Sequence, residues 1–277
     1  MDPSAGPTGG TLPVASTIPC ERLPRDGGET IAFRRRPGRS PGIVFIGGFR
    51  SDMTGVKASA VDAFCAARGH ACLRFDPFAH GASSGRWADA TVGRWAADLL
   101  AALDALTEGP LILVGSSMGG WLMLLAALAR PARIAALLGI AAAPDATEEL
   151  MWNRFSPEQR ESLLRDGRIT VPSEYDPAGY VLTRRLIEEG RRHLVLRTGL
   201  PVRCPVRLLH GLADRDVPWT IGRRLAECLA GTDVALTLVK NGDHRLSAPA
   251  DLARLRLTLE ELFGRCGSAA GQGPASS

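Results

Sequence analysis

Residues 111–121 read Leu-Ile-Leu-Val-Gly-Ser-Ser-Met-Gly-Gly-Trp, and they carry the strongest structural signal in the chain. The first four residues are a continuous apolar run, which is typical of a β-strand covered on both faces. Residues 115–119 match the pattern G-x-S-x-G, in which a serine occupies a sharp turn between a strand and a helix. A helix is predicted over residues 121–128, ending before Pro131. Ser117 is therefore expected at the tip of a strand-turn-helix unit.

The same alternation of apolar strands with helices continues on both sides of this turn. An alternating βαβα order predicts a mostly parallel sheet covered by helices on both faces, which is the α/β fold class. Ligands in such sheets bind at the carboxyl ends of the strands, so the loops there are expected to carry the site. Further strands are expected at residues 43–46, 71–75, 134–140, 206–209 and 234–239, and helices at 55–68, 95–106, 221–229 and 252–262.

One segment, residues 144–200, interrupts this order with charged helical stretches that are broken by prolines. It is interpreted as a small helical cap inserted into a single α/β domain that spans residues 28–266. Residues 1–27 and 267–277 contain stretches of low complexity rich in Pro, Gly and Ser, a composition that favours disorder. The expected organisation is one catalytic domain with a cap, a disordered or loosely ordered N-terminal segment and a disordered tail.

The composition argues against several classes of partner. The 277 residues carry a net charge of +4, with 45% hydrophobic and 22% charged residues, which is ordinary for a globular protein. No stretch approaches the ~20 continuous apolar residues of a membrane helix, so no membrane span is expected. The densest basic run, Arg34 to Arg36 with Arg39, is interpreted as a solvated surface turn. We therefore expect no nucleic acid partner.

The six cysteines lie at scattered positions, without a C-x-x-C pair or a Cys/His cluster at metal-binding spacing. No metal, no cofactor and no disulfide framework are expected. The first twenty residues lack the basic start and apolar run of a secretory signal. Together with reduced thiols, this indicates a cytoplasmic protein, and a mitochondrial location is the alternative.

A serine hydroxyl attacks at neutral pH only when a base removes its proton. His244 is the expected base, because it follows the last predicted strand and comes after both the serine and a candidate acid. The other histidines have simpler interpretations. His70 is expected on the surface and His193 in the insertion, while His80 and His210 follow strands and are expected to line the cleft as structural residues.

The acid that orients the imidazole is expected between the serine and the base. Residues 210–218, His-Gly-Leu-Ala-Asp-Arg-Asp-Val-Pro, follow a predicted strand in that interval. Asp214 is the expected acid. Asp216 is the competitor, and its alternative role is to cap the next helix. Asp243, adjacent to the histidine, is expected to support its loop.

Acyl transfer also needs N–H donors for the negative oxygen that develops in the transition state. The expected donors are the backbone N–H groups of Met118 and Phe49, with Gly48 allowing a close approach of the backbone. Apolar residues of the insertion are expected either to line an acyl channel or simply to pack the cap, and both interpretations stay open. The residues expected to bind substrate are Gly48, Trp121, Met151 and Trp152.

Taken together, these motifs resemble the α/β-hydrolase superfamily in order and spacing over residues 28–264. Within it, residues 47–52 and the Ser-Ser-Met-Gly-Gly-Trp turn resemble the palmitoyl-protein thioesterase group called α/β-hydrolase-domain protein ten and its bacterial relatives. The resemblance implies a serine hydrolase that removes S-acyl chains from protein cysteines or deacylates acyl glucuronides. The matching stretches are residues 47–49, 75–83, 115–121, 210–218 and 243–244.

Three other functions are compatible with the same residues. A serine peptidase uses the same nucleophile on a different leaving group, and an acyltransferase differs only in the acceptor that releases the acyl group. A non-catalytic hydrolase-like fold that binds a hydrophobic ligand or a protein is the alternative from another class. The sequence does not indicate an oligomeric state, an acyl chain length or a preference between small acyl esters and S-acylated proteins.

Overall fold

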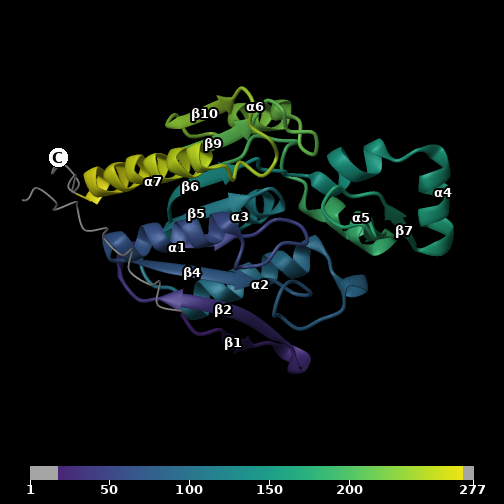
Figure 1. Cartoon of the computed structure of the whole chain (residues 1–277), viewed down its shortest axis with the longest axis horizontal. Coiled ribbons are helices and arrows are strands. Elements are labelled where there is room, and N and C mark those ends of the chain that lie inside the picture. The colour runs from purple at the N-terminus through teal and green to yellow at the C-terminus, as the bar shows by residue number, and fades with distance from the viewer. Residues whose placement is uncertain (1–17, 271–277) are drawn as a thin grey trace, which may run out of the picture.

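The computed structural model describes residues 18–270, whose centre is an eight-stranded sheet (Figure 1). In spatial order its strands are β1 (Glu21–Pro24), β2 (Thr30–Arg36), β4 (His70–Asp76), β3 (Arg39–Ile46), β5 (Leu111–Ser116), β6 (Ile134–Ile140), β9 (Val206–Gly211) and β10 (Val234–Val239). From β4 to β10 neighbouring strands are parallel, and β1 and β2 add antiparallel pairing at one edge. The expected α/β fold with a mostly parallel sheet is therefore confirmed.

Helices cover both faces of this sheet (Figure 1). One face carries α1 (Val56–Arg68) and α7 (Pro249–Ala270), and the other carries α2 (Val92–Leu106), α3 (Met118–Ala129) and α6 (Trp219–Cys228). Successive residues of a strand point to opposite faces, so Leu113 of β5 joins one apolar cluster while Ile112 and Val114 join the other. Short helical turns η1 (Asp26–Gly28), η2 (Trp87–Asp89) and η3 (Pro131–Arg133) complete the domain.

The segment between β6 and β9 leaves the sheet and forms a separate lobe beyond one end of it (Figure 1). Its helix α4 begins with a capping box, in which the Ser156 hydroxyl accepts from Gln159 N–H and the Gln159 side chain accepts from Ser156 N–H. A two-stranded antiparallel sheet, which the sequence analysis did not predict, lies beside it. The lobe contains η4 (Thr147–Met151), η5 (Trp152–Arg154), α4 (Pro157–Asp166), β7 (Arg168–Val171), β8 (Tyr180–Thr183), α5 (Arg184–Gly190) and η6 (Arg191–His193).

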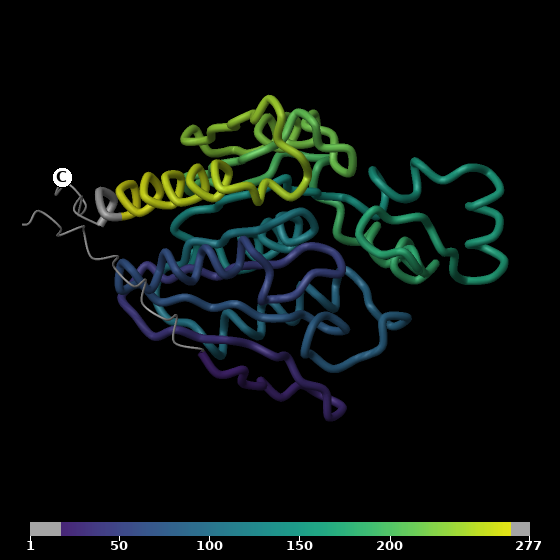
Figure 2. Tube along the Cα trace, in the orientation of Figure 1, coloured from purple at the N-terminus to yellow at the C-terminus, as the bar shows by residue number. Residues whose placement is uncertain are grey.

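Two chain segments connect the lobe to the rest of the domain (Figure 2). Asp145, just after β6, joins the outgoing segment to the returning one. Its buried carboxylate accepts the N–H of Val195 at 2.7 Å and that of Leu196 at 2.9 Å. A carboxylate with two backbone donors fixes the geometry of both segments. The lobe is thus anchored to the sheet at a defined position.

Two expectations about the ends of the domain were wrong in part. Within residues 1–27, β1 pairs with β2 as an ordered edge strand, while residues 1–17 lie outside the described residues. At the other end, α7 continues through Ala270, so residues 267–270 are helical, and 271–277 lie outside the described residues. In both places, pairing or helix continuation overrides a composition that favours disorder.

Two surface interpretations also fail. The basic run Arg34 to Arg36 belongs to β2 and pairs with β4, and the Arg36 guanidinium donates to Asp62 at 2.9 Å. His70 is buried, with its ring 4.1 Å from that of Phe263. Cys65 and Cys72 are buried. Among residues 18–270, no helix is long and apolar enough to cross a membrane.

Candidate active site

The turn at Ser117 joins β5 to α3 in a conformation that is rare for a residue with a side chain. Ser117 has φ 54° and ψ −120°, and its N–H donates to the carbonyl of Ile140 at 2.9 Å. A Cβ at Gly119 would lie 2.1 Å from the Ile46 carbonyl oxygen, so only glycine fits beside the neighbouring strand. The G-x-S-x-G pattern therefore encodes a close contact between α3 and β3 that presents the Ser117 hydroxyl at the strand end. Its neighbour Ser116 is buried at the end of β5.

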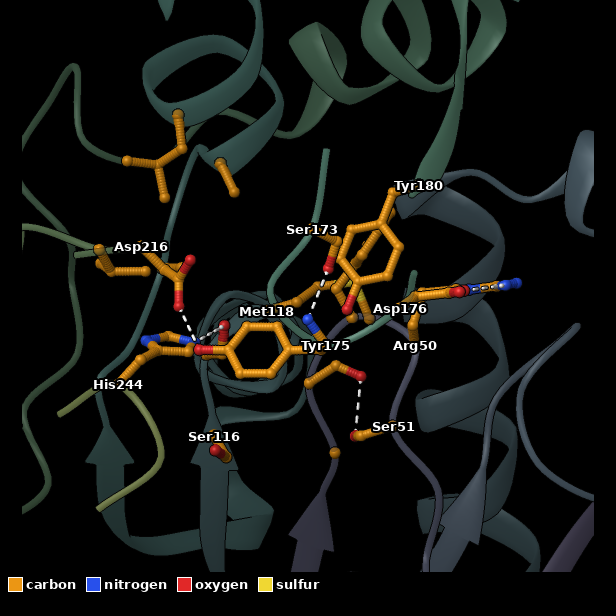
Figure 3. Close-up of a pocket in the computed structure, with 18 of the residues that line it drawn as sticks. Arg50, Ser51, Ser116, Met118, Ser173, Tyr175, Asp176, Tyr180, Asp216 and His244 are labelled. Atoms are coloured by element: carbon orange, nitrogen blue, oxygen red, sulfur yellow. Dashed lines mark hydrogen bonds and ion pairs between the residues drawn. The ribbon is translucent and has the colours of Figure 1, made fainter. Parts of the chain in front are cut away.

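His244, in the loop after β10, reaches this hydroxyl (Figure 3). Its Nε2 lies 3.0 Å from Ser117 Oγ, and its Nδ1 lies 2.8 Å from Asp214 Oδ2. A carboxylate only accepts hydrogen bonds, so Nδ1 is assigned as the protonated nitrogen. Nε2 is then the lone-pair nitrogen that faces the serine proton.

Asp214 follows β9, and its side chain is completely buried. Oδ1 accepts the N–H groups of Asp216 at 3.0 Å and Val217 at 2.8 Å, while His210 Nε2 lies 3.4 Å from Oδ2. Burial alone would raise the pKa of Asp214, but hydrogen bonds from His210 and His244 outweigh it and hold that pKa well below its usual range. The carboxylate is therefore ionised at neutral pH.

Asp216 occupies a different place. Its Oδ2 accepts the Tyr175 hydroxyl at 2.5 Å (Figure 3). Its expected alternative role as a helix cap was wrong, because α6 begins after Pro218 and has no side-chain cap. Asp243 Oδ1 accepts the N–H of Leu246 at 2.8 Å, as expected for a residue that supports the loop.

The two expected oxyanion donors flank the serine. Met118 begins α3, so its N–H belongs to the first turn, where backbone donors lack partners within the helix. Phe49 lies in the loop after β3, where a Cβ at the preceding Gly48 would be 3.2 Å from Ser117 Cβ. The missing side chain at Gly48 thus lets the Phe49 backbone approach the nucleophile.

A cavity of about 1280 Å³ opens above Ser117, between the sheet and the lobe. Gly48, Trp121 and Met151, three of the residues expected to bind substrate, line it. Trp121 is almost wholly buried, and its Nε1 donates to the carbonyl of His193 at 2.9 Å, so it forms a fixed wall. Trp152, which was also expected to bind substrate, is not among the lining residues.

Trp152 packs on its own lobe instead. Its ring lies 6.4 Å from that of Phe155, and the Arg191 guanidinium stands 4.7 Å from its ring centroid. These contacts hold the Trp152 ring on the lobe, whereas the preceding residue, Met151, lines the cavity.

The cavity lining divides into two chemical classes. Charged side chains come mainly from loops, namely those after β3, around Asp214 and His244, and between β7 and β8 of the lobe, and apolar side chains come mainly from α2, α3 and the lobe. The apolar residues from the lobe both line the cavity and pack against the core, so the two open interpretations are compatible. The apolar class includes Val92, Trp95, Trp121, Leu150, Met151, Phe155, Leu182 and Leu186, and the charged class includes Arg50, Asp52, Lys57, Glu174, Asp176, Arg215 and Arg245.

Tyr175 extends from the loop between β7 and β8 across the space in front of His244 and Met118 (Figure 3). The Arg245 guanidinium lies 4.7 Å from its ring centroid, and the next residue, Asp176, pairs with Arg50 at 3.6 Å. Burial and the hydrogen bond to Asp216 raise the pKa of the Tyr175 phenol, which stays protonated. The partner of Tyr175, Asp216, lies 41 residues away in the chain, so no local sequence pattern predicts this contact.

One set of ionisable groups in the described part of the chain lies close enough for a metal ion, namely Asp214, Asp216 and His244. Their ligand atoms are already engaged: Asp214 with His244, and Asp216 with Tyr175. The donor set is that of a hydrogen-bonded triad with a neighbouring carboxylate.

Comparison with known proteins agrees with this geometry. Residues 43–177 match the family model described as alpha/beta hydrolase fold. The mouse mitochondrial palmitoyl-protein thioesterase ABHD10 is 44% identical over 236 residues, which cover 85% of this chain and 79% of that protein. The human ABHD10 protein is 42% identical, with 85% and 77% covered.

Two solved structures are similar over nearly the whole described domain. Mouse alpha/beta hydrolase domain-containing protein 10 matches with a TM-score of 0.84 at 42% identity, covering 89% of this chain and 99% of that one. A hydrolase from Agrobacterium vitis S4 matches with a TM-score of 0.84 at 38% identity, covering 88% and 99%. This chain therefore belongs to the α/β-hydrolase family, in the group of the ABHD10 thioesterases, as its motifs indicated.

Proposed function

We propose that this enzyme hydrolyses acyl thioester and ester bonds through an acyl-enzyme on Ser117. The observation that carries the proposal is the continuous chain of contacts from Ser117 Oγ to His244 Nε2, at 3.0 Å, and from His244 Nδ1 to Asp214, at 2.8 Å. It lies at the carboxyl ends of β5, β9 and β10, where α/β sheets bind ligands. A buried carboxylate, an imidazole and a hydroxyl in this order are the parts of a serine hydrolase.

In the first half of the reaction, His244 Nε2 takes the Ser117 proton while Oγ attacks the acyl carbonyl. The carbonyl oxygen becomes an oxyanion that the Met118 and Phe49 N–H groups stabilise. The intermediate collapses, the bond to the leaving sulfur or oxygen breaks, and His244 gives its proton to that leaving group. The acyl group is then covalently bound to Ser117.

In the second half, His244 takes a proton from water, which attacks the acyl-serine. The second tetrahedral intermediate then collapses, the bond from the acyl carbon to Ser117 Oγ breaks, His244 returns its proton to Oγ, and the carboxylic acid is released. Asp214 stays ionised throughout and stabilises the imidazolium that forms in each half.

The cavity supports a long acyl chain as the group that is transferred. Each methylene that leaves water for an apolar wall contributes about 0.8 kcal/mol, and the side chains from α2, α3 and the lobe offer such a wall. The curated relatives are named palmitoyl-protein thioesterases, which supports an S-acylated protein as the physiological substrate. They are also named as mitochondrial, which was the alternative compartment, and a cytoplasmic location stays a prediction.

The test begins with covalent labelling by a fluorophosphonate probe, followed by turnover of a palmitoyl-thioester peptide, p-nitrophenyl palmitate and a peptide amide. We expect wild type and Ser116→Ala to be labelled and to release palmitate, and Ser117→Ala to do neither. A wild type that is not labelled would favour a binding module. Cleavage of the amide alone would indicate a peptidase, and acyl release only to an added acceptor would indicate an acyltransferase.

A further inference from the structure

His80 is a buried histidine that the triad does not use, although it lines the same cavity. It follows β4, and its ring lies 5.4 Å from the ring of Trp87 and 5.3 Å from that of Trp95. The Phe49 ring packs edge-on against the same Trp87 at 4.9 Å. His80 is therefore adjacent to the loop that carries the expected oxyanion donor.

The hydrogen bonds of His80 define its tautomer. Nδ1 lies 3.0 Å from the carbonyl of Phe78, which can only accept, so Nδ1 is assigned as the donor. Nε2 is then free to accept, and the N–H of Arg50 donates to it at 3.2 Å. Burial, assisted by the charge of Arg50, lowers the pKa of His80 to about 4, so Nε2 keeps its lone pair at neutral pH.

This bond holds the oxyanion loop at an unfavourable backbone conformation. Arg50 has φ 61°, in the left-handed region that side chains disfavour. The peptide between Phe49 and Arg50 must be held in place from outside, because the local preference of Arg50 would turn it away. The acceptor that meets this peptide is His80 Nε2.

Further hydrogen bonds fix the backbone of the loop that carries His80. The Asp76 carboxylate accepts the N–H of Met53 at 2.7 Å and that of Ala82 at 2.9 Å, which joins the oxyanion loop to the loop of His80. Asp98 accepts the N–H of Phe78 at 2.8 Å. The imidazole is thus fixed on both sides and can position its partner.

We propose that His80 is a positioning residue, which holds the turn at Phe49 and Arg50 so that the Phe49 N–H faces the oxyanion formed at Ser117. The inference rests on the proposed function, because it assigns Phe49 as a donor. Donors aimed in advance at the oxyanion stabilise the transition state without reorganising during the reaction. A loosened loop would lose that advantage and leave the ground state unchanged.

The test compares His80→Phe, which keeps a ring and removes the acceptor, with His80→Gln, whose amide oxygen can accept at the Nε2 position. Loss of one oxyanion donor costs about 10²–10³ in kcat, so displacing it is expected to lower kcat by about 10- to 100-fold in His80→Phe. KM should stay within about twofold, as for an interaction made only in the transition state. His80→Gln should recover most of the loss.

The rate of fluorophosphonate labelling is the second measurement, because the phosphoryl oxygen of the adduct occupies the same donors. It should fall in His80→Phe and remain at the wild-type rate in the control His70→Phe, a buried histidine that packs on Phe263. If His80→Phe does not fold, His80→Met replaces it. The proposal fails if the acceptor-free variant keeps its labelling rate, or if His80→Gln loses as much.

The two proposals fail separately. A wild type that is labelled but releases no acyl group from thioesters or esters would remove the proposed substrates, while the labelling rates would still decide the role of His80. Normal turnover by wild type and by His80→Phe would leave the proposed function intact and remove the positioning role.

Discussion

The two sides of the cavity above Ser117 are built in different ways. The sheet side presents Ser117, Asp214 and His244 from turns that directly follow β5, β9 and β10, and the Asp214 side chain is wholly buried. The lobe side presents residues such as Tyr175, which is 40% exposed, and its loop is held by side-chain pairs such as Arg50 with Asp176 at 3.6 Å. The three residues assigned to the reaction thus stand on turns of the central sheet, and the lobe side is held by more exposed side-chain contacts.

Asp214 and Asp216 lie two residues apart in the chain, and their variants give the strongest test of this division between the sheet side and the lobe side. Asp214→Asn should lower kcat by about 10⁴, because an amide that replaces the carboxylate no longer selects the imidazole tautomer. Asp216 contacts Tyr175 of the lobe, and an amide oxygen can still accept that hydroxyl. Asp216→Asn should therefore change kcat by less than about threefold, a small effect typical of an exposed polar contact. Steady-state kinetics on one ester checks both values.

The opposite ranking of these two variants would reassign the acid to Asp216. Thermal unfolding of each protein is the control, since Asp214 is buried and an amide has only one acceptor oxygen, which cannot serve both the N–H groups of Asp216 and Val217 and the two histidines. A loss of kcat in fully folded Asp214→Asn is the result that supports the division between the two sides.

A second pair of neighbours tests the lobe side. Met151 lines the cavity and Trp152 does not, so Met151→Trp should shorten the space for an acyl chain. Excluding even two methylenes from an apolar wall costs about 1.6 kcal/mol at about 0.8 kcal/mol each. Turnover of palmitoyl substrates should therefore fall at least about tenfold relative to acetyl substrates, as measured over a series of p-nitrophenyl esters.

Trp152→Phe is the matched control and should keep the wild-type chain-length profile. A uniform decrease for all chain lengths in Met151→Trp would mean that the substitution disturbs the triad. An altered profile in Trp152→Phe would mean that the lobe moves far enough to bring that residue into the cavity.

The same division explains what could be predicted from the sequence. The strands under the triad are mostly apolar, and β10 was predicted with its observed bounds, residues 234–239. Each triad side chain follows such a strand closely in the chain, so local pattern and chain order were enough to bring Ser117, His244 and Asp214 together. The glycine at position 119 also allows the close contact between α3 and β3 on which the turn at Ser117 depends.

The missed features depend on partners that are distant in the chain. β2 contains three arginines in a row, and the ion pair of Arg36 with Asp62 of α1 carries no local signal. The hairpin of β7 and β8 is stabilised by pairing between strands that are separated by a loop containing two prolines. The direction of the Trp152 side chain depends on the single turn of η5. His70 was expected on the surface because it follows a glycine, but Phe263 of α7 covers it.

Lys57 gives the smallest test, because it links the sheet side to the loop of His244 without belonging to the triad. Its Nζ donates to the carbonyl of Arg245, and burial, with the nearby charge of Arg245, lowers the pKa of Lys57 from 10.5 to about 8. The neighbouring carboxylates of Asp243 and Asp251 oppose this shift. The folded protein thus gives up the lysine proton at a lower pH than the unfolded chain does.

Between pH 8 and 10.5 the unfolded chain holds more of the Lys57 proton than the folded protein, so the contribution of this group to the free energy of unfolding rises with pH, by at most about 1.4 kcal/mol per pH unit. Other groups titrate in the same window. The quantity to compare is therefore the difference in the free energy of unfolding between wild type and Lys57→Met, measured by urea unfolding at pH 7.5, 9 and 10, on the order of one pH unit apart. That difference should shift in favour of wild type as the pH rises, whereas the exposed Lys240→Met should follow wild type at every pH. If the free energies of unfolding of wild type and Lys57→Met changed in parallel with pH, the Lys57 ammonium would be as well hydrated in the folded protein as in the unfolded chain. The sheet side of the cavity would then be open to water beside His244.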